Sequence, residues 1–169
     1  MILSRFLSRV LLTSVLSLGG FGLSITPARA AHTLKSYAYD TGLKKAQAES
    51  KWVLVKFERE DCVYCGQMTR EMQNNATTRQ LLNKDFVWVQ VDQKGQRKVR
   101  YQNREITEAQ LTQQLKAWNY PYLLFLKPDG TPIGGLMGYQ SPQAMQSLLT
   151  YIRSEAYEKM SFEAYQKGK

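Results

Sequence analysis

Four short, apolar, β-rich runs place the strongest constraint on the fold of this chain. They span residues 52–57, 86–91, 122–126 and 131–136. Segments with helical spacing separate the first three runs, and a parallel pair of strands needs such a crossover. The turn Pro128-Asp129-Gly130 joins the last two, so these strands are expected to be antiparallel. The order predicts an α/β fold with a four-stranded mixed sheet flanked by helices.

The segments between the runs carry start signals for helices. Asp40 is expected to cap a helix over 40–50, Thr77 or Thr78 a short one, and Thr107 with Gln110 forms a capping box for 107–118. Ser141-Pro142 opens a further helix. Residues 94–104 are compatible with a hairpin or a loop, and 160–169 is a polar tail that is compatible with one or two further helical turns.

The first thirty residues have the pattern of a secretory signal peptide. Arg5 and Arg9 precede an apolar stretch over 10–18, and Ala28-Arg29-Ala30 offers small residues at a cleavage site. The apolar stretch is shorter than the ~20 residues of a spanning helix, although a retained anchor is the alternative. We therefore expect residues 1–30 to be removed after Ala30, and residues 31–169 to form one domain in the periplasm.

The charge of the predicted mature chain indicates no nucleic-acid partner. Three of the 23 Lys and Arg residues lie in the signal segment, so the net charge falls from +9 to +6. Nucleic-acid binding needs a clustered basic patch, and the densest basic run, 97–100, is short.

Cys62-Val63-Tyr64-Cys65 follows the first strand and begins a helix expected over 62–75. Two cysteines three apart at a helix start lie on one face, one turn apart, close enough to form a disulfide. Cys62 sits where helix N–H groups are unpaired and the macrodipole is positive, which stabilises a thiolate. Cys62 is therefore predicted to attack a disulfide, and Cys65 to resolve the mixed intermediate.

Three other interpretations of the cysteine pair are less well supported by the sequence. Zinc needs four ligands, and only His32 remains to help the two cysteines. Haem attachment would place His where Gly66 stands. A structural disulfide closing so small a loop gains little loop-closure entropy. We expect a redox site that uses no metal and no cofactor.

Residues 52–68, Tyr120-Pro121-Tyr122 and the turn at 128–130 resemble the thioredoxin superfamily over about 34–157. Phe57-Glu58-x-x-x-Cys62-x-Tyr64-Cys65 is similar to the exported bacterial SoxW-like group. The resemblance implies that Pro121 faces the two cysteines with a cis peptide bond. It also implies that Tyr120 and Pro121 shape the substrate groove. Tyr64 is either a substrate-binding residue that stacks against a partner's side chain or a solvent-tolerant loop residue.

The chain departs from that family at a position important for proton transfer. Cytoplasmic thioredoxins carry a buried acid six residues before the first cysteine, and here that residue is Lys56. Glu58 shares a strand face with Lys56. The two form either a proton-transfer site or an ordinary ion pair. Trp52, Trp88 and Trp118 are expected to pack in the core.

The resemblance implies a periplasmic thiol–disulfide oxidoreductase acting on protein thiols or disulfides. We favour a monomeric reductase or isomerase, recycled by a membrane electron-transfer partner. The alternative is a thioredoxin-fold binding or assembly module with a non-catalytic cysteine pair. No residue marks the substrate.

Overall fold

A computed structural model describes residues 33–168. The predicted signal peptide, its cleavage site after Ala30 and His32 lie outside the described residues. Among the helices of the described part, none is long and apolar enough to cross a membrane.

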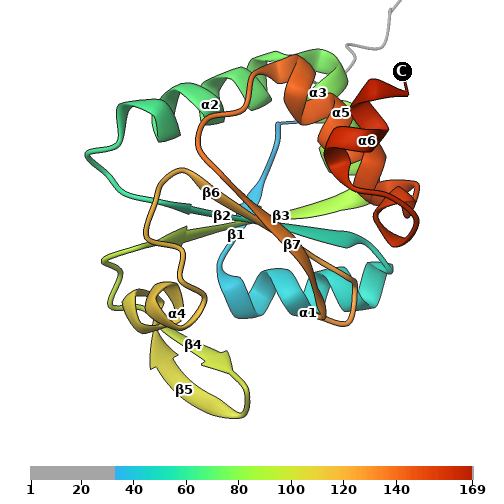
Figure 1. The fold of residues 1–169 in the computed structure, drawn as a ribbon. Coiled ribbons are helices and arrows are strands. Elements are labelled where there is room, and N and C mark those ends of the chain that lie inside the picture. Colours follow the sequence, from blue (N-terminus) through green and yellow to red (C-terminus); the bar gives the residue numbers. More distant parts are fainter. Residues whose placement is uncertain (1–32, 169) are drawn as a thin grey trace, which may run out of the picture. The chain divides into compact units, whose positions relative to one another are not determined.

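The central sheet has five strands in the order β1-β3-β2-β6-β7 (Figure 1). Strand β2 pairs in parallel with β3 and antiparallel with β6, and β6 pairs antiparallel with β7. The predicted mixed α/β sheet is confirmed, but it has one strand more than expected. That strand, β1, is only two residues long and so carries no periodic signal. The strands are β1 (Ser36–Tyr37), β2 (Trp52–Glu58), β3 (Phe86–Asp92), β6 (Tyr122–Leu126) and β7 (Pro132–Met137).

Helices cover both faces of this sheet. Helices α2, α3 and α5 lie over one face, and α1 and α4 over the other (Figure 1). Because side chains alternate along a strand, Leu54 joins the core under α2, whereas Val53 and Val55 join the core beside α1. The helices are α1 (Tyr39–Glu49), α2 (Val63–Asn74), α3 (Ala76–Asp85), α4 (Glu108–Gln114), α5 (Pro142–Arg153) and α6 (Phe162–Lys167), with a 3-10 turn, η1 (Ala156–Glu158), after α5.

The helix starts agree only partly with the predicted caps. Thr107 and Gln110 form the expected capping box, and Ser141 caps α5. Asp40 does not cap α1, which begins after Ala38. Its carboxylate instead accepts the backbone N–H of Arg100 at 2.9 Å. Similarly, Asn75 rather than Thr77 or Thr78 caps α3.

The ambiguous segment before α4 is a hairpin. Strand β4 (Lys98–Tyr101) pairs antiparallel with β5 (Arg104–Thr107) in a separate two-stranded sheet. The hydrogen bond from the Arg100 N–H to the Asp40 carboxylate joins this hairpin to α1. Asp40 therefore binds a residue distant in sequence instead of capping its own helix.

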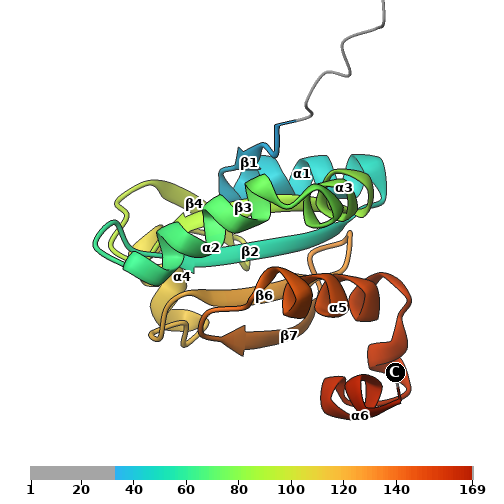
Figure 2. The same cartoon turned by 90° about the horizontal axis from the view of Figure 1, so that it is seen from above.

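The C-terminal segment packs against the domain, although its composition indicates a polar tail. Helix α6 turns back beside α5 (Figure 2). The rings of Phe162 and Tyr165 lie 5.3 and 5.2 Å from the ring of Tyr151. Tyr157 in η1 packs edge-on against Trp52, with ring centroids 6.0 Å apart. The few aromatic residues of this segment therefore extend the core under α5.

Candidate active site

The cysteine pair lies where β2 ends and α2 begins. Cys62 and Cys65 form a disulfide with an S–S distance of 2.12 Å and a Cα–Cα distance of 5.2 Å. Cys62 is the N-cap of α2, and its Sγ accepts the backbone N–H of Cys65 at 3.0 Å. The helix start thus directs the Cys65 N–H, which also donates to the Cys62 carbonyl at 3.1 Å, at the Cys62 sulfur.

The two cysteines differ in their access to solvent. Cys65 is 1% exposed, whereas Cys62 is half-buried. Between them, Val63 and Tyr64 are 76% and 63% exposed. A groove of about 580 Å³ opens beside Cys62, so an incoming group can reach this sulfur more easily than that of Cys65. The groove is lined by Glu58, Arg59, Glu60, Cys62, Gly66, Thr69, Arg70, Gln90, Asp92 and Arg97.

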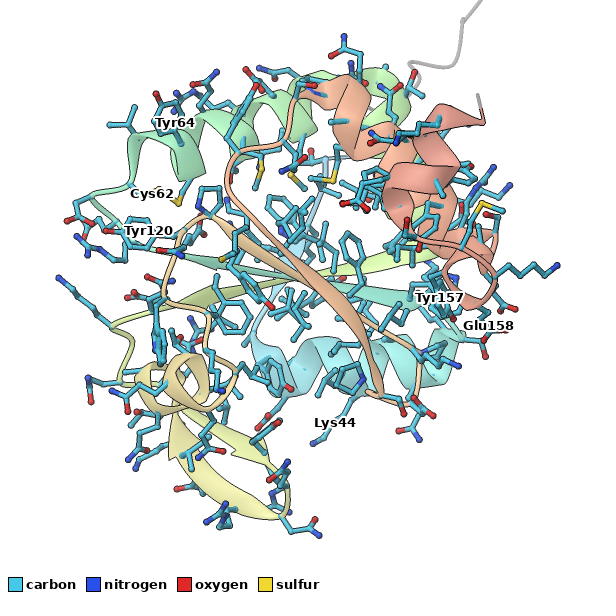
Figure 3. All side chains as sticks on the ribbon, in the orientation of Figure 1. Lys44, Cys62, Tyr64, Tyr120, Tyr157 and Glu158 are labelled. Carbon is cyan, nitrogen blue, oxygen red and sulfur yellow. A yellow bond between two sulfur atoms is a disulfide. The ribbon has the colours of Figure 1, made fainter. Side chains whose placement is uncertain are left out.

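The predicted proline segment lies at the same end of the molecule. The Tyr120–Pro121 peptide bond is cis, as predicted. Figure 3 shows Cys62, Tyr64 and Tyr120 gathered at this end. The Arg59 guanidinium stacks 4.6 Å from the centroid of the Tyr120 ring, and the Arg59 carbonyl accepts the N–H of Cys62 at 3.2 Å. Arg59 thereby links the cysteine loop to the proline segment.

The segment after β7 joins this arrangement. Gly138 donates its N–H to the Pro121 carbonyl at 2.8 Å. The ring of the next residue, Tyr139, lies 6.2 Å from that of Tyr64. Its hydroxyl donates to the Glu71 carboxylate on α2, which lowers the pKa of Glu71. The Tyr139 contact with α2 was not indicated by the sequence, because it joins residues 68 positions apart.

Two exposed apolar side chains lie in the segment before β6 and at the end of β7. Trp118 was expected to pack in the core, but it is 63% exposed. The physical reason is that α4 ends at Gln114, so the chain runs along the surface before β6. Met137 at the end of β7 is 59% exposed, and its sulfur accepts the side-chain N–H of Asn119 at 3.3 Å. Sequence patterning did not single out Met137.

Lys56 and Glu58 lie on the same strand face, as predicted, and they form an ion pair at 2.5 Å. Lys56 is 0% exposed, and its Nζ donates to the Cys65 carbonyl at 3.1 Å and to the Thr69 hydroxyl. Burial lowers the pKa of Lys56, and the Glu58 carboxylate opposes that change. Glu58 also accepts the Gln90 side-chain N–H at 2.7 Å. A buried ammonium group therefore contacts the backbone of the second cysteine.

No group of three or more metal-binding side chains comes together anywhere in residues 33–168.

Several solved structures share this fold. A thioredoxin-fold protein from Helicobacter pylori is 22% identical, with a TM-score of 0.61 over 70% of this chain and 84% of that one. A thioredoxin from Thermus thermophilus is 24% identical, with a TM-score of 0.57 over 71% and 87%. A DsbH oxidoreductase is 21% identical, with a TM-score of 0.57 over 84% and 96%. At these identities the likeness shows the fold alone.

Sequence comparison identifies the family. None of the curated proteins compared with the chain matches it. A model of the thioredoxin-like domain matches residues 39–153, which hold both cysteines, the cis-proline and every strand of the central sheet except β1. The protein has a thioredoxin-like oxidoreductase fold with its cysteine pair at disulfide distance, and it belongs to the thioredoxin-like domain family.

Proposed function

We propose that this protein is an exported thiol–disulfide oxidoreductase that exchanges electrons with protein disulfides through Cys62 and Cys65. The observation that carries this proposal is the disulfide between an accessible N-cap cysteine and a buried cysteine one turn inside the same helix.

The proposed reaction is a two-step exchange. In the reduced protein, the Cys62 thiolate attacks one sulfur of a substrate disulfide, forms a mixed disulfide and releases the first substrate thiolate. Cys65 then loses its proton and attacks the Cys62 sulfur, which releases the second substrate thiolate. Two electrons pass from the cysteine pair to the substrate, and the Cys62–Cys65 disulfide remains.

The geometry supports Cys62 as the attacking residue. In the disulfide form, the N–H of Cys65 and the positive end of the 12-residue helix α2 both face the Cys62 sulfur. These features favour a thiolate over a thiol. Cys65 is enclosed, so it meets a disulfide only after that disulfide has been brought to it through Cys62.

We further propose that an extended apolar segment of the substrate binds across the cysteines. Tyr120 and Pro121 precede β6, and in this proposal the Tyr120 backbone pairs with the substrate segment as with an added strand. Tyr64, Trp118 and Met137 are exposed and offer apolar area against which such a segment can bury its own apolar side chains. This surface sets the preference for a protein substrate over a small disulfide.

The finer aspects of the proposal rest on the sequence. We propose that the protein belongs with the SoxW-like group, loses residues 1–30 on export and works in the periplasm as a monomer. Reduction or isomerisation of substrates requires a partner that returns electrons, so we propose a membrane electron-transfer protein in that role. The mass of the exported protein tests the cleavage, because a product beginning at Ala31 is expected and one retaining residues 1–30 contradicts it.

A trapping experiment tests the central proposal. Reduced Cys65→Ser protein is incubated with a denatured disulfide protein such as insulin, and covalent products are resolved by non-reducing electrophoresis and mass spectrometry. We expect a stable mixed disulfide through Cys62. The matched variant Cys62→Ser is expected to trap nothing. If neither variant forms the adduct, and the wild-type protein does not reduce insulin, the pair is non-catalytic and the binding-module alternative holds.

A further inference from the structure

We propose that Lys56 is a positioning residue that favours the reduced form of the cysteine pair, by holding a buried positive charge behind Cys65. This inference rests on the proposed exchange function and deepens it. According to this inference, Lys56 shifts the equilibrium between the dithiol and the disulfide towards the dithiol.

The contacts of Lys56 place its charge on the active-site helix. Its Nζ donates to the carbonyl of Cys65, at 3.1 Å, and to the hydroxyl of Thr69 one turn later. The side chain is 0% exposed. The ammonium group is thus held against the same residue whose thiol must ionise, with no intervening path for bulk solvent to screen the interaction.

The other groups around Lys56 leave Glu58 as its counter-ion. On β3, the Trp88 ring lies 5.9 Å from Nζ, and Gln90 pairs with Lys56 across the sheet. On β6 its register partner is Leu123. Of these neighbours only Glu58, at 2.5 Å, is ionisable. An isolated buried ammonium would lose its proton, so the carboxylate keeps Lys56 charged.

This charge acts on one side of the redox equilibrium only. The disulfide carries no charge, whereas the reduced pair carries the negative charge of the Cys62 thiolate. A neighbouring positive charge therefore stabilises the reduced form, which makes the protein a stronger oxidant. A buried acid at the same position would have the opposite effect. Because of Lys56, this chain is expected to hold its electrons more tightly than an otherwise equal protein with an acid there.

The same arrangement gives the resolving step a proton path. Cys65 must release its proton before its sulfur attacks Cys62, and the nearby ammonium favours that release. The proton passes to solvent water at the groove beside Cys62, which Glu58 lines with a side chain that is 23% exposed. The Cys65 sulfur then bonds to Cys62, and the substrate thiolate leaves.

The test is the equilibrium constant of each variant with reduced and oxidised glutathione at pH 7, read by trapping and mass spectrometry. Lys56→Met keeps the length of the side chain and removes its charge. We expect it to shift the constant at least tenfold towards the disulfide, which is about 30 mV more reducing. The matched control is Lys51→Met, which removes the same charge roughly 16 Å back along the strand. It is expected to leave the constant unchanged.

A second variant keeps the test decisive if Lys56→Met folds poorly by circular dichroism. Glu58→Gln removes the carboxylate that keeps Lys56 protonated, so the buried amine loses its charge while the side chain of Lys56 stays in place. It is expected to shift the constant in the same direction as Lys56→Met, towards the disulfide. If folded Lys56→Met matches the wild type within twofold, or if Glu58→Gln shifts the constant towards the dithiol, the inference is wrong. The proposed function fails separately, when the wild-type protein itself does not equilibrate with glutathione.

Discussion

Two helical glycines provide a quantitative test of how α1 and α2 pack. A Cβ added at Gly42 in α1 would lie 2.2 Å from Cγ2 of Val89, which is 0% exposed in β3. Val89 is β-branched and enclosed, so it cannot rotate away and α1 must move. Overpacking of this kind costs about 3 kcal/mol, whereas replacing a helical glycine by alanine gains about 1 kcal/mol. Gly42→Ala is therefore expected to lose about 2 kcal/mol of unfolding free energy.

Gly66 in α2 is the matched control. The nearest atom to an added Cβ there is the end of the flexible Arg70 side chain, at 3.3 Å. Gly66→Ala should keep the full helix gain of about 1 kcal/mol, so the two variants differ by about 3 kcal/mol. For a domain of this size the difference corresponds to roughly 10 °C in Tm. Urea unfolding of both oxidised variants, followed by circular dichroism, measures it. A Gly42→Ala protein as stable as Gly66→Ala would refute the close packing of α1 on β3.

Three further predictions concern single groups. Limited alkylation of the reduced protein with iodoacetamide should label Cys62 before Cys65 in peptide mass spectrometry, because Cys65 is buried; equal labelling would contradict the assigned roles. Burial raises the pKa of Glu108, so the folded protein binds its proton more tightly than the unfolded chain and loses stability as pH rises above about 4.5. Glu108→Gln is consequently expected to be more stable relative to wild type at pH 7 than at pH 4.5 in urea unfolding, and a constant difference would contradict this. Tyr151→Phe removes the hydrogen bond to the Met160 carbonyl at 2.7 Å and should cost about 1 kcal/mol in the same assay, whereas no loss would show that the C-terminal segment is not anchored there.

The main outline of the fold could be predicted from local patterns. Four of the five sheet strands, the capping box at Thr107 and the start of α5 at Ser141 follow from short-range signals that tertiary structure did not override. The two residues of β1 carry no such signal, because their strand exists only through pairing with β3. Asp40 was assigned to the wrong partner for a similar reason, since its hydrogen bond crosses 60 residues to the hairpin.

The site shows the same division between local and long-range information. The spacing of Cys62 and Cys65, and the alternation that places Lys56 and Glu58 on one face, are local properties of a helix start and a strand. The contact between Lys56 and Cys65 is not a local property, because the hydrogen bond from Lys56 to the Cys65 carbonyl depends on how α2 lies over the sheet. Trp118 was assigned to the core on its residue type alone, and the early end of α4 reversed that assignment.

The reduction potential of the wild-type Cys62–Cys65 couple tests the central claim most directly. The protein is equilibrated with a series of glutathione redox buffers at pH 7, and the fraction of disulfide is read by thiol trapping and mass spectrometry. A couple that equilibrates freely between about −100 and −300 mV is predicted for a thiol–disulfide exchange site. A potential far below −300 mV, or a failure to equilibrate, would identify a structural bond and contradict the account.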